Sequence, residues 1–330
     1  MTLRLRTGPR RRHRDWDGIA VVGAGLVLLA ALGAGTVRLC GVPARGESAP
    51  TAVRIQPLDG VAAEALLPPR PRPFLTTHRV VAYYGNPLVP QMGILGEYEP
   101  EELVRRLRAQ ADVYQRLGPD RTVVPAIHMI YAVAQDNPGR EGAYLLRMDD
   151  ELVDRWVQLT RDNGMLLFLD IQFGRSSIDR EFPHVAPFLK QPHVHLAIDP
   201  EFAWGTDEYP LVDIGHIDGA VVNRAQELLE RLAVENRLPN KMLVVHQFRP
   251  DMLTNKASIR PSDWVETVID ADGFGRRDIK LDQWDRVIRE DNVQRPGIKL
   301  FYKHDARSGG LMSEDEVMAL TPTPLVIIYQ

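Results

Sequence analysis

The chain has 330 residues, of which 44% are hydrophobic and 25% charged, a balance that is ordinary for a globular protein. Its net charge of −4 is uneven, because residues 1–17 hold six arginines against two aspartates and the remainder is acidic. An acidic body argues against a nucleic-acid partner, which requires a basic surface. The single cysteine, Cys40, excludes an intrachain disulfide, so the stability of the fold should come from its core.

The N-terminus combines the basic segment 1–17 with an apolar run, Gly18–Val37, that carries no charge. A helix of this length would just span a ~30 Å hydrocarbon core. The arginines should stay in the cytoplasm and direct the following chain outward. We therefore expect residues 18–37 to form a transmembrane anchor that places a single-pass protein in the cell membrane, with an extracytoplasmic C-terminal domain. The alternative is a signal peptide that is cleaved near residues 31–35, which would give a secreted protein.

Residues 38–77 form a different kind of segment, because residues 41–77 contain seven prolines and little hydrophobic periodicity. Such a composition is typical of an extended tether that buries too little apolar surface to fold. The remaining residues, 78–330, are long enough to build a sizeable core without disulfides. We therefore expect one folded domain over residues 78–330 behind a poorly ordered tether.

Eight short apolar runs follow, each rich in branched or aromatic residues, as buried strands are. The runs are Arg79–Tyr84, Ala126–Tyr131, Leu166–Gln172, Val194–Asp199, Met242–Gln247, Trp264–Asp270, Ile298–His304 and Leu325–Tyr329.

The segments between the runs have helical periodicity, most clearly at Glu101–Leu117, Asp150–Asp162 and Ala220–Asn236, and a capping box at Ser313 opens a shorter helix. Eight strands that alternate with helices over about 250 residues predict an α/β protein with a (β/α)8 TIM-type barrel. The eighth run is the last, so no eighth helix is predicted, and part of the tether is a candidate to cover that side. The alternative is a doubly wound open sheet, but the glycine motif expected at its first turn is absent.

Polar residues gather at the C-terminal ends of these runs, where TIM barrels build their active sites. Side chains alternate along a strand, so one face of Val194–Asp199 and of Ile298–Asp305 is aliphatic and the other holds the polar residues. We expect one pocket at the barrel mouth, lined by Asp170, Asp199, Glu201, Asp272 and Asp305, with His246, Lys303 and Tyr83 at its walls. Further candidates for substrate contact are His128, Gln172, Trp204 and Gln247.

The strand-end carboxylates, above all Asp199-Pro200-Glu201 after the fourth run, resemble those of secreted TIM-barrel glycoside hydrolases. Many such enzymes carry the proton donor at this strand end. No named family motif matches, and the four-carboxylate DxxDxDxE pattern of chitinase-like enzymes is absent. The resemblance implies hydrolysis of a carbohydrate or cell-wall glycan without a cofactor.

Glycoside hydrolysis needs one neutral carboxyl as acid and a second, ionised carboxylate as nucleophile or base. We expect Glu201 to be the acid, with Asp199 beside it to raise its pKa. Asp305 or Asp170 would be the partner carboxylate. Trp204 and Tyr83 could stack on sugar rings.

Two other functions fit the same residues. One is a non-catalytic barrel that binds glycan or another envelope component. The other is a metal-dependent hydrolase, for which the donor residues would be His128, Asp170, His246, Asp272 and His304. No HxH or HExxH spacing occurs at these strand ends, so we expect no metal ligands there. Lys303 would also permit Schiff-base chemistry if its amine were buried.

Overall fold

The computed structural model describes residues 72–291, 293 and 295–330. The predicted basic segment, the apolar run 18–37 and nearly all of the tether lie outside these residues. Within the described part of the chain, no helix is long and apolar enough to cross a membrane.

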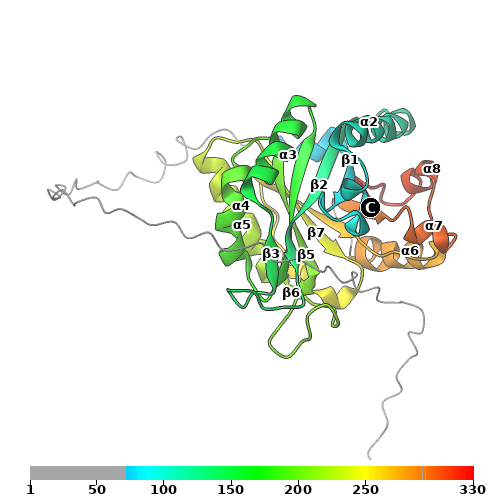
Figure 1. Cartoon of the computed structure of the whole chain (residues 1–330). Helices are drawn as coiled ribbons and strands as arrows, with labels where there is room; N and C mark the ends of the chain where they lie inside the picture. Colours follow the sequence, from blue (N-terminus) through cyan, green and yellow to red (C-terminus); the bar gives the residue numbers. More distant parts are fainter. Residues whose placement is uncertain (1–71, 292, 294) are drawn as a thin grey trace, which may run out of the picture.

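Eight parallel strands form a closed barrel, and the apolar runs predicted all eight of them (Figure 1). Pairing runs around the barrel from the first strand to the eighth, and the eighth pairs back with the first, so the predicted barrel is confirmed and the open sheet is wrong. In chain order the barrel strands are β1 (His78–Gly85), β2 (Thr122–Ala134), β4 (Leu166–Gly174), β5 (Val194–Ala203), β7 (Lys241–Gln247), β9 (Val265–Ala271), β10 (Pro296–Leu300) and β11 (Val326–Tyr329).

Helices lie between the strands on the outside of the barrel (Figure 1). Two of them begin at well-formed caps: the Asp149 carboxylate accepts two backbone N–H groups at the start of α3, and Ser313 and Glu316 complete the predicted capping box of α8. The helices are α2 (Pro100–Leu117), α3 (Asp150–Asp162), α4 (Ile178–Leu189), α5 (Gly219–Glu235), α6 (Arg277–Trp284) with the π-helical turn η6 (Asp285–Arg289), α7 (His304–Arg307) and α8 (Glu314–Met318).

Short elements decorate the connections. Strand β3 (Leu145–Arg147) pairs antiparallel with the end of β2, and β6 (Ile217–Asp218) pairs with β8 (Leu253–Thr254). Five 3₁₀ turns complete the described chain: η1 (Phe74–Thr76), η2 (Pro90–Met92), η3 (Ile94–Gly96), η4 (Pro250–Met252) and η5 (Lys256–Ser258).

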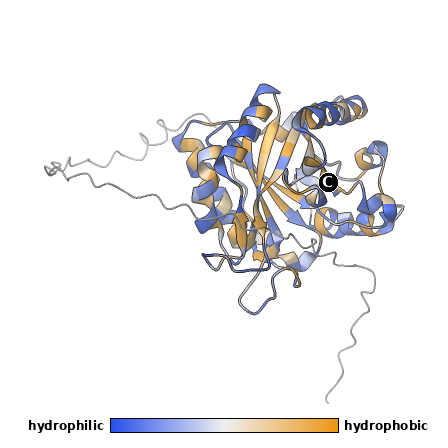
Figure 2. Ribbon diagram, viewed as in Figure 1, coloured by the Kyte–Doolittle hydropathy of each residue, from blue (hydrophilic) through white to orange (hydrophobic). Residues whose placement is uncertain are grey.

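Alternating side chains divide the apolar residues into two layers. One layer fills the space between strands and helices, and includes Val81, Leu196 and Ile327. The other fills the barrel itself, and includes Ala82 and Phe168. Figure 2 shows the hydrophobic strands enclosed by helices whose outer faces are hydrophilic. The apolar core therefore lies on both sides of the sheet. Inside the barrel it is interrupted by the polar side chains that point inward from the strands.

The N-terminal end of the barrel is closed by η1, which begins within the segment expected to be tether. Leu75 is only 1% exposed and packs with the apolar residues inside the barrel. The backbone N–H groups of Phe74 and Leu75 donate to the Glu266 carboxylate at 2.6 and 3.2 Å. The folded domain therefore includes residues 74–77, because Leu75 supplies apolar surface that closes the core.

Candidate active site

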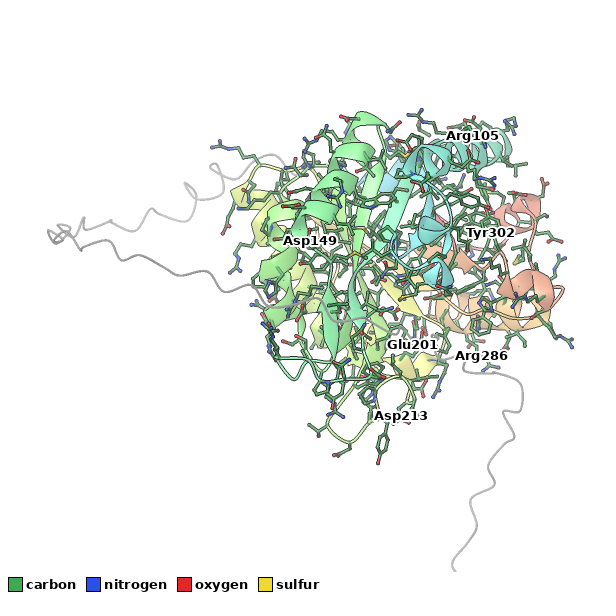
Figure 3. The ribbon with its side chains drawn as sticks, viewed as in Figure 1. Arg105, Asp149, Glu201, Asp213, Arg286 and Tyr302 are labelled. Atoms are coloured by element: carbon green, nitrogen blue, oxygen red, sulfur yellow. The ribbon has the colours of Figure 1, made fainter. Side chains whose placement is uncertain are left out.

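A pocket of about 310 Å3 opens at the C-terminal mouth of the barrel. Its polar lining includes Tyr84, Gln172, Asp199, Glu201, Asp272 and Lys299, and its aromatic lining includes Phe202, Trp204, Phe248, Phe274 and Phe301. Figure 3 shows Glu201 close to the loop that carries Asp213, which also lines the pocket. Concave apolar walls around a few convergent polar groups are typical of a ligand site.

Strand β5 brings Asp199 and Glu201 to the mouth, because residues two apart on a strand face the same side. Asp199 is buried, and its carboxylate accepts the backbone N–H of Glu201 at 3.1 Å. Burial raises the pKa of the Glu201 carboxyl to about 7, and the negative charge of Asp272 adds to this effect. Asp199 was expected to raise the pKa of Glu201, but burial and Asp272 are what raise it.

Asp272 lies in the same pocket with the opposite electrostatic balance. Burial alone would raise its pKa, but Lys299 Nζ at 3.2 Å and His246 Nδ1 at 3.3 Å outweigh burial and lower it. Lys299 is itself buried and stays cationic, because the surrounding aspartates raise its pKa against the effect of burial. The pocket thus holds one carboxyl, Glu201, whose protonated form is favoured, and one, Asp272, whose ionised form is favoured.

A polar layer lies beneath the pocket floor and is fully buried. His246 Nδ1 contacts Asp270 Oδ2 at 2.9 Å, and the Tyr84 hydroxyl donates to Asp170 Oδ2 at 2.9 Å. Burial would lower the pKa of His246, but the carboxylates around it, led by Asp170, raise it well above its usual value. Burial and the neighbouring His246 hold the pKa of His128 well below its usual range. This layer therefore supplies a second positive charge next to Asp272.

The same layer contains the donor atoms of the metal alternative. His128, Asp170 and His246 place one donor atom each within 4.8 Å of one another, as do His246, Asp270 and Asp272. These residues could hold a metal ion. Of the five, Asp272 also lines the pocket, and the other four are not among its lining residues. His304 is on α7, outside both groups.

The structure brings together five of the predicted site residues, because Asp199, Glu201, Asp272, Gln172 and Trp204 all line the mouth pocket. Asp170, His246 and His128 point into the barrel as alternation requires, but they lie one layer deeper. The roles assigned to these residues remain predictions.

Four predicted residues lie elsewhere. Tyr83 faces the helix layer, because its neighbour Tyr84 takes the inward position, and it lines a separate hollow beside α2. Lys303 is exposed and forms an ion pair with Glu97 at 2.6 Å, so it lacks the buried amine that Schiff-base chemistry would need. Gln247 also points outward, where its amide contacts Arg249 O and Lys256 Nζ.

Asp305 is the fourth, and its position has a clear physical cause. Strand β10 ends at Leu300, whereas the predicted run continued to His304. The chain turns after Leu300 because the buried Asp305 carboxylate accepts the backbone N–H of Phe301 at 2.9 Å. Asp305 also accepts Gly275 N–H and pairs with Lys280 at 3.2 Å. Asp305 therefore supports the pocket wall through the backbone of Gly275 and Phe301, and it does not line the pocket itself.

The pocket residues that were missed as site candidates include Tyr84 and Lys299. Lys299 lies on the inward face of its run, between the aliphatic residues Ile298 and Leu300. A lysine at an inward position of a buried strand could have indicated a site residue from the sequence alone. Its ammonium lies 3.6 Å from the centre of the Tyr84 ring, so the two residues form one unit in the pocket wall.

No protein-family model matches the sequence, and no curated protein matches it. Among solved structures, the chain is similar to the mannanase man26 of Bacillus subtilis, with a TM-score of 0.43 and 8% identity over 79% of this chain and 86% of that one. It is also similar to a GH5-4 broad-specificity endoglucanase from Clostridium longisporum, with a TM-score of 0.35 and 10% identity over 68% of this chain and 75% of that one. Both neighbours are glycoside hydrolases.

Proposed function

We propose that this protein is a glycoside hydrolase that works by carboxylate acid/base catalysis at the barrel mouth. The supporting observation is the pair Glu201 and Asp272: both line one pocket, and their surroundings move their pKa values in opposite directions. Two carboxyls kept in different protonation states are what glycoside cleavage needs. A protein that only binds glycan has no need of this separation.

In the proposed reaction, Glu201 donates its proton to the oxygen of the scissile glycosidic bond as that bond breaks. Asp272 stays ionised and stabilises the positive charge that develops on the sugar ring, as nucleophile or as base toward water. Lys299 and His246 hold Asp272 in this state through contacts of 3.2 and 3.3 Å. The aromatic walls would pack against sugar rings and exclude water.

We also propose that the barrel acts outside the cytoplasm on envelope or environmental glycan. The motivation is the uncharged run 18–37 behind six arginines. Protease added to intact cells should remove the barrel domain of the full-length protein from the membrane fraction. A soluble product that begins near residues 34–41 would instead indicate signal cleavage.

The activity is tested with purified protein on soluble mannan, cellulose derivatives, xylan, chitosan and peptidoglycan, by release of reducing ends. Glu201→Gln should lower kcat by roughly 10²- to 10⁴-fold, because the amide keeps the shape but has no proton to donate. The exposed Glu235→Gln is the matched control and should leave kcat unchanged. Equal turnover in Glu201→Gln and wild type would rule out Glu201 as the acid. Glycan binding without turnover in the wild type would favour the non-catalytic alternative.

A further inference from the structure

A second hollow lies beside the mouth pocket, between α2 and the turn from β10 into α7. Its volume is about 600 Å3. Figure 3 shows Tyr302 between helix α2, which carries Arg105, and the C-terminal helices. The hollow is lined by Tyr83, Tyr98, Tyr302, Arg105, Arg106 and Gln110, among others. None of these residues belongs to the proposed catalytic set.

The hollow and the mouth pocket are adjacent. Gln91, His304 and Gln330 line both of them. Gln330 is fixed at this boundary, because its backbone N–H donates to Leu300 O and its carbonyl accepts the N–H of Tyr302, both at 2.9 Å. The two hollows therefore share a boundary that these three residues form.

The lining has the chemistry that recognises sugar rings. Tyrosines offer flat apolar surface with a polar hydroxyl, and amide and guanidinium groups offer planar hydrogen-bonding edges. Tyr302 is pre-organised, because its ring stacks on Tyr329 with centroids 4.9 Å apart and its hydroxyl donates to Gln110 Oε1 at 3.2 Å. Rigid side chains lose little conformational entropy when a ligand binds, which favours affinity.

The cations around the hollow already have partners. Lys303 pairs with Glu97 at 2.6 Å, and both arginines contact the Glu102 carboxylate at 2.5 and 2.6 Å. The Arg106 guanidinium also lies 4.2 Å from the centre of the Tyr98 ring. These three cations share two carboxylates and leave a net charge of only +1, so the hollow suits a hydroxyl-rich ligand better than a multiply charged anion.

We infer that this hollow is a second glycan-binding subsite, which holds sugar units that continue from the unit cleaved at the mouth. The inference rests on the proposed function and adds the substrate class: a glycan chain rather than a small glycoside. Each aromatic contact in the hollow should then raise kcat/KM for chains that reach it by roughly 3- to 10-fold.

The test fills the hollow without touching the catalytic carboxyls. Ala109 is exposed on α2 and lines the hollow, so Ala109→Trp should obstruct it. Asp112→Trp is the matched control, because Asp112 is exposed on the same helix but does not line the hollow. The readout is the ratio of kcat/KM for six-unit to two-unit oligomers of whichever panel glycan is cleaved. Thermal melts confirm that both variants are folded.

We expect the six-to-two ratio to exceed tenfold in wild type and in Asp112→Trp, and to fall at least threefold in Ala109→Trp. Tyr98→Ala removes an aromatic surface of the hollow without filling it, and it should lower the ratio in the same direction. A wild-type ratio near one, or an unchanged ratio in folded Ala109→Trp, would overturn the subsite while leaving the proposed hydrolysis intact. Failure to cleave any panel glycan would instead defeat the proposed function, and this inference with it.

Discussion

At the N-terminal end of the barrel, the buried charges of Glu266 and Lys241 are satisfied largely by the backbone, whereas at the C-terminal end buried charges crowd against one another. Glu266 accepts two backbone N–H groups and pairs with Arg295 at 3.1 Å, and Lys241 donates to Gln191 O and Val194 O at 2.7 and 2.9 Å. In and below the mouth pocket, one carboxylate oxygen each of Asp170, Asp270 and Asp272 is buried without a hydrogen-bond partner.

The difference separates two uses of a buried charge. A charge whose hydrogen bonds are complete fastens chain segments together and adds stability. Carboxylates that are crowded and incompletely bonded cost stability, and proteins retain such arrangements mainly at functional sites. The same division is typical of TIM barrels, in which the N-terminal face serves stability and the C-terminal face serves activity.

The largest expected effect is on activity at the mouth. Asp272→Asn should lower kcat by roughly 10²- to 10⁴-fold, because the ionised partner of Glu201 is lost. The melting temperature should fall only slightly, because Lys299 and His246 lose one carboxylate partner but keep Asp170 and Asp270 nearby. Glycan hydrolysis and calorimetry on the same samples measure both, with the exposed Asp251→Asn as control. A fall of many degrees in the melting temperature would mean that Asp272 stabilises the fold, as Glu266 and Lys241 do at the N-terminal end of the barrel.

The next effect is on stability at the other end. Leu75→Ala should lower the free energy of unfolding by about 2–5 kcal/mol, because it leaves a cavity where η1 closes the barrel. The exposed Leu88, at 68%, gives the matched control, and Leu88→Ala should change the unfolding free energy by less than about 0.5 kcal/mol. Denaturant titrations of the two variants measure the difference. Equal stabilities would show that η1 does not close the core.

Glu266→Gln should have a smaller effect in the same direction. The amide keeps one acceptor for η1 but loses the charge that pairs with Arg295, and we expect a loss of about 1–3 kcal/mol. The partial exposure of Arg295 keeps the loss toward the low end of that range. The check is a chemical-denaturation series against Glu99→Gln, an exposed site. A more stable Glu266→Gln variant would break the contrast between the two ends.

The smallest effect is the dependence on pH. Glu201 must be protonated to act as acid, so kcat/KM should fall about tenfold per pH unit above about pH 7. The folded protein also keeps a proton that the unfolded chain releases at about pH 4.3. The stability contributed by Glu201 should therefore be complete below about pH 4 and be lost as pH rises through about 7. Glu201→Gln should abolish this part of the pH dependence, and unfolding curves between pH 4 and 8 would show whether it does.

Local patterns in the sequence were enough to predict the eight strands and the inward direction of Asp170, Asp199, Glu201 and Asp272. A strand alternates its side chains whatever surrounds it, so the inward face follows once the strand is recognised. The assignment was wrong for Asp305 and Lys303, because β10 ends early at a hydrogen bond that Asp305 itself makes. It was also wrong for Tyr83, where Tyr84 takes the inward place.

The sequence by itself determined the barrel and the set of polar side chains that point into it, since both depend on periodicity along single segments. Only the tertiary structure decided which of those side chains meet in the pocket and which lie below it. Depth in a barrel depends on the stagger between neighbouring strands, and the pairing of β4 shifts register against both β2 and β5 near the mouth. The opposite pKa shifts of Glu201 and Asp272 are decided in the same way, because they arise from burial and from charges on β7, on β10 and just after β9 that come close only when the barrel closes.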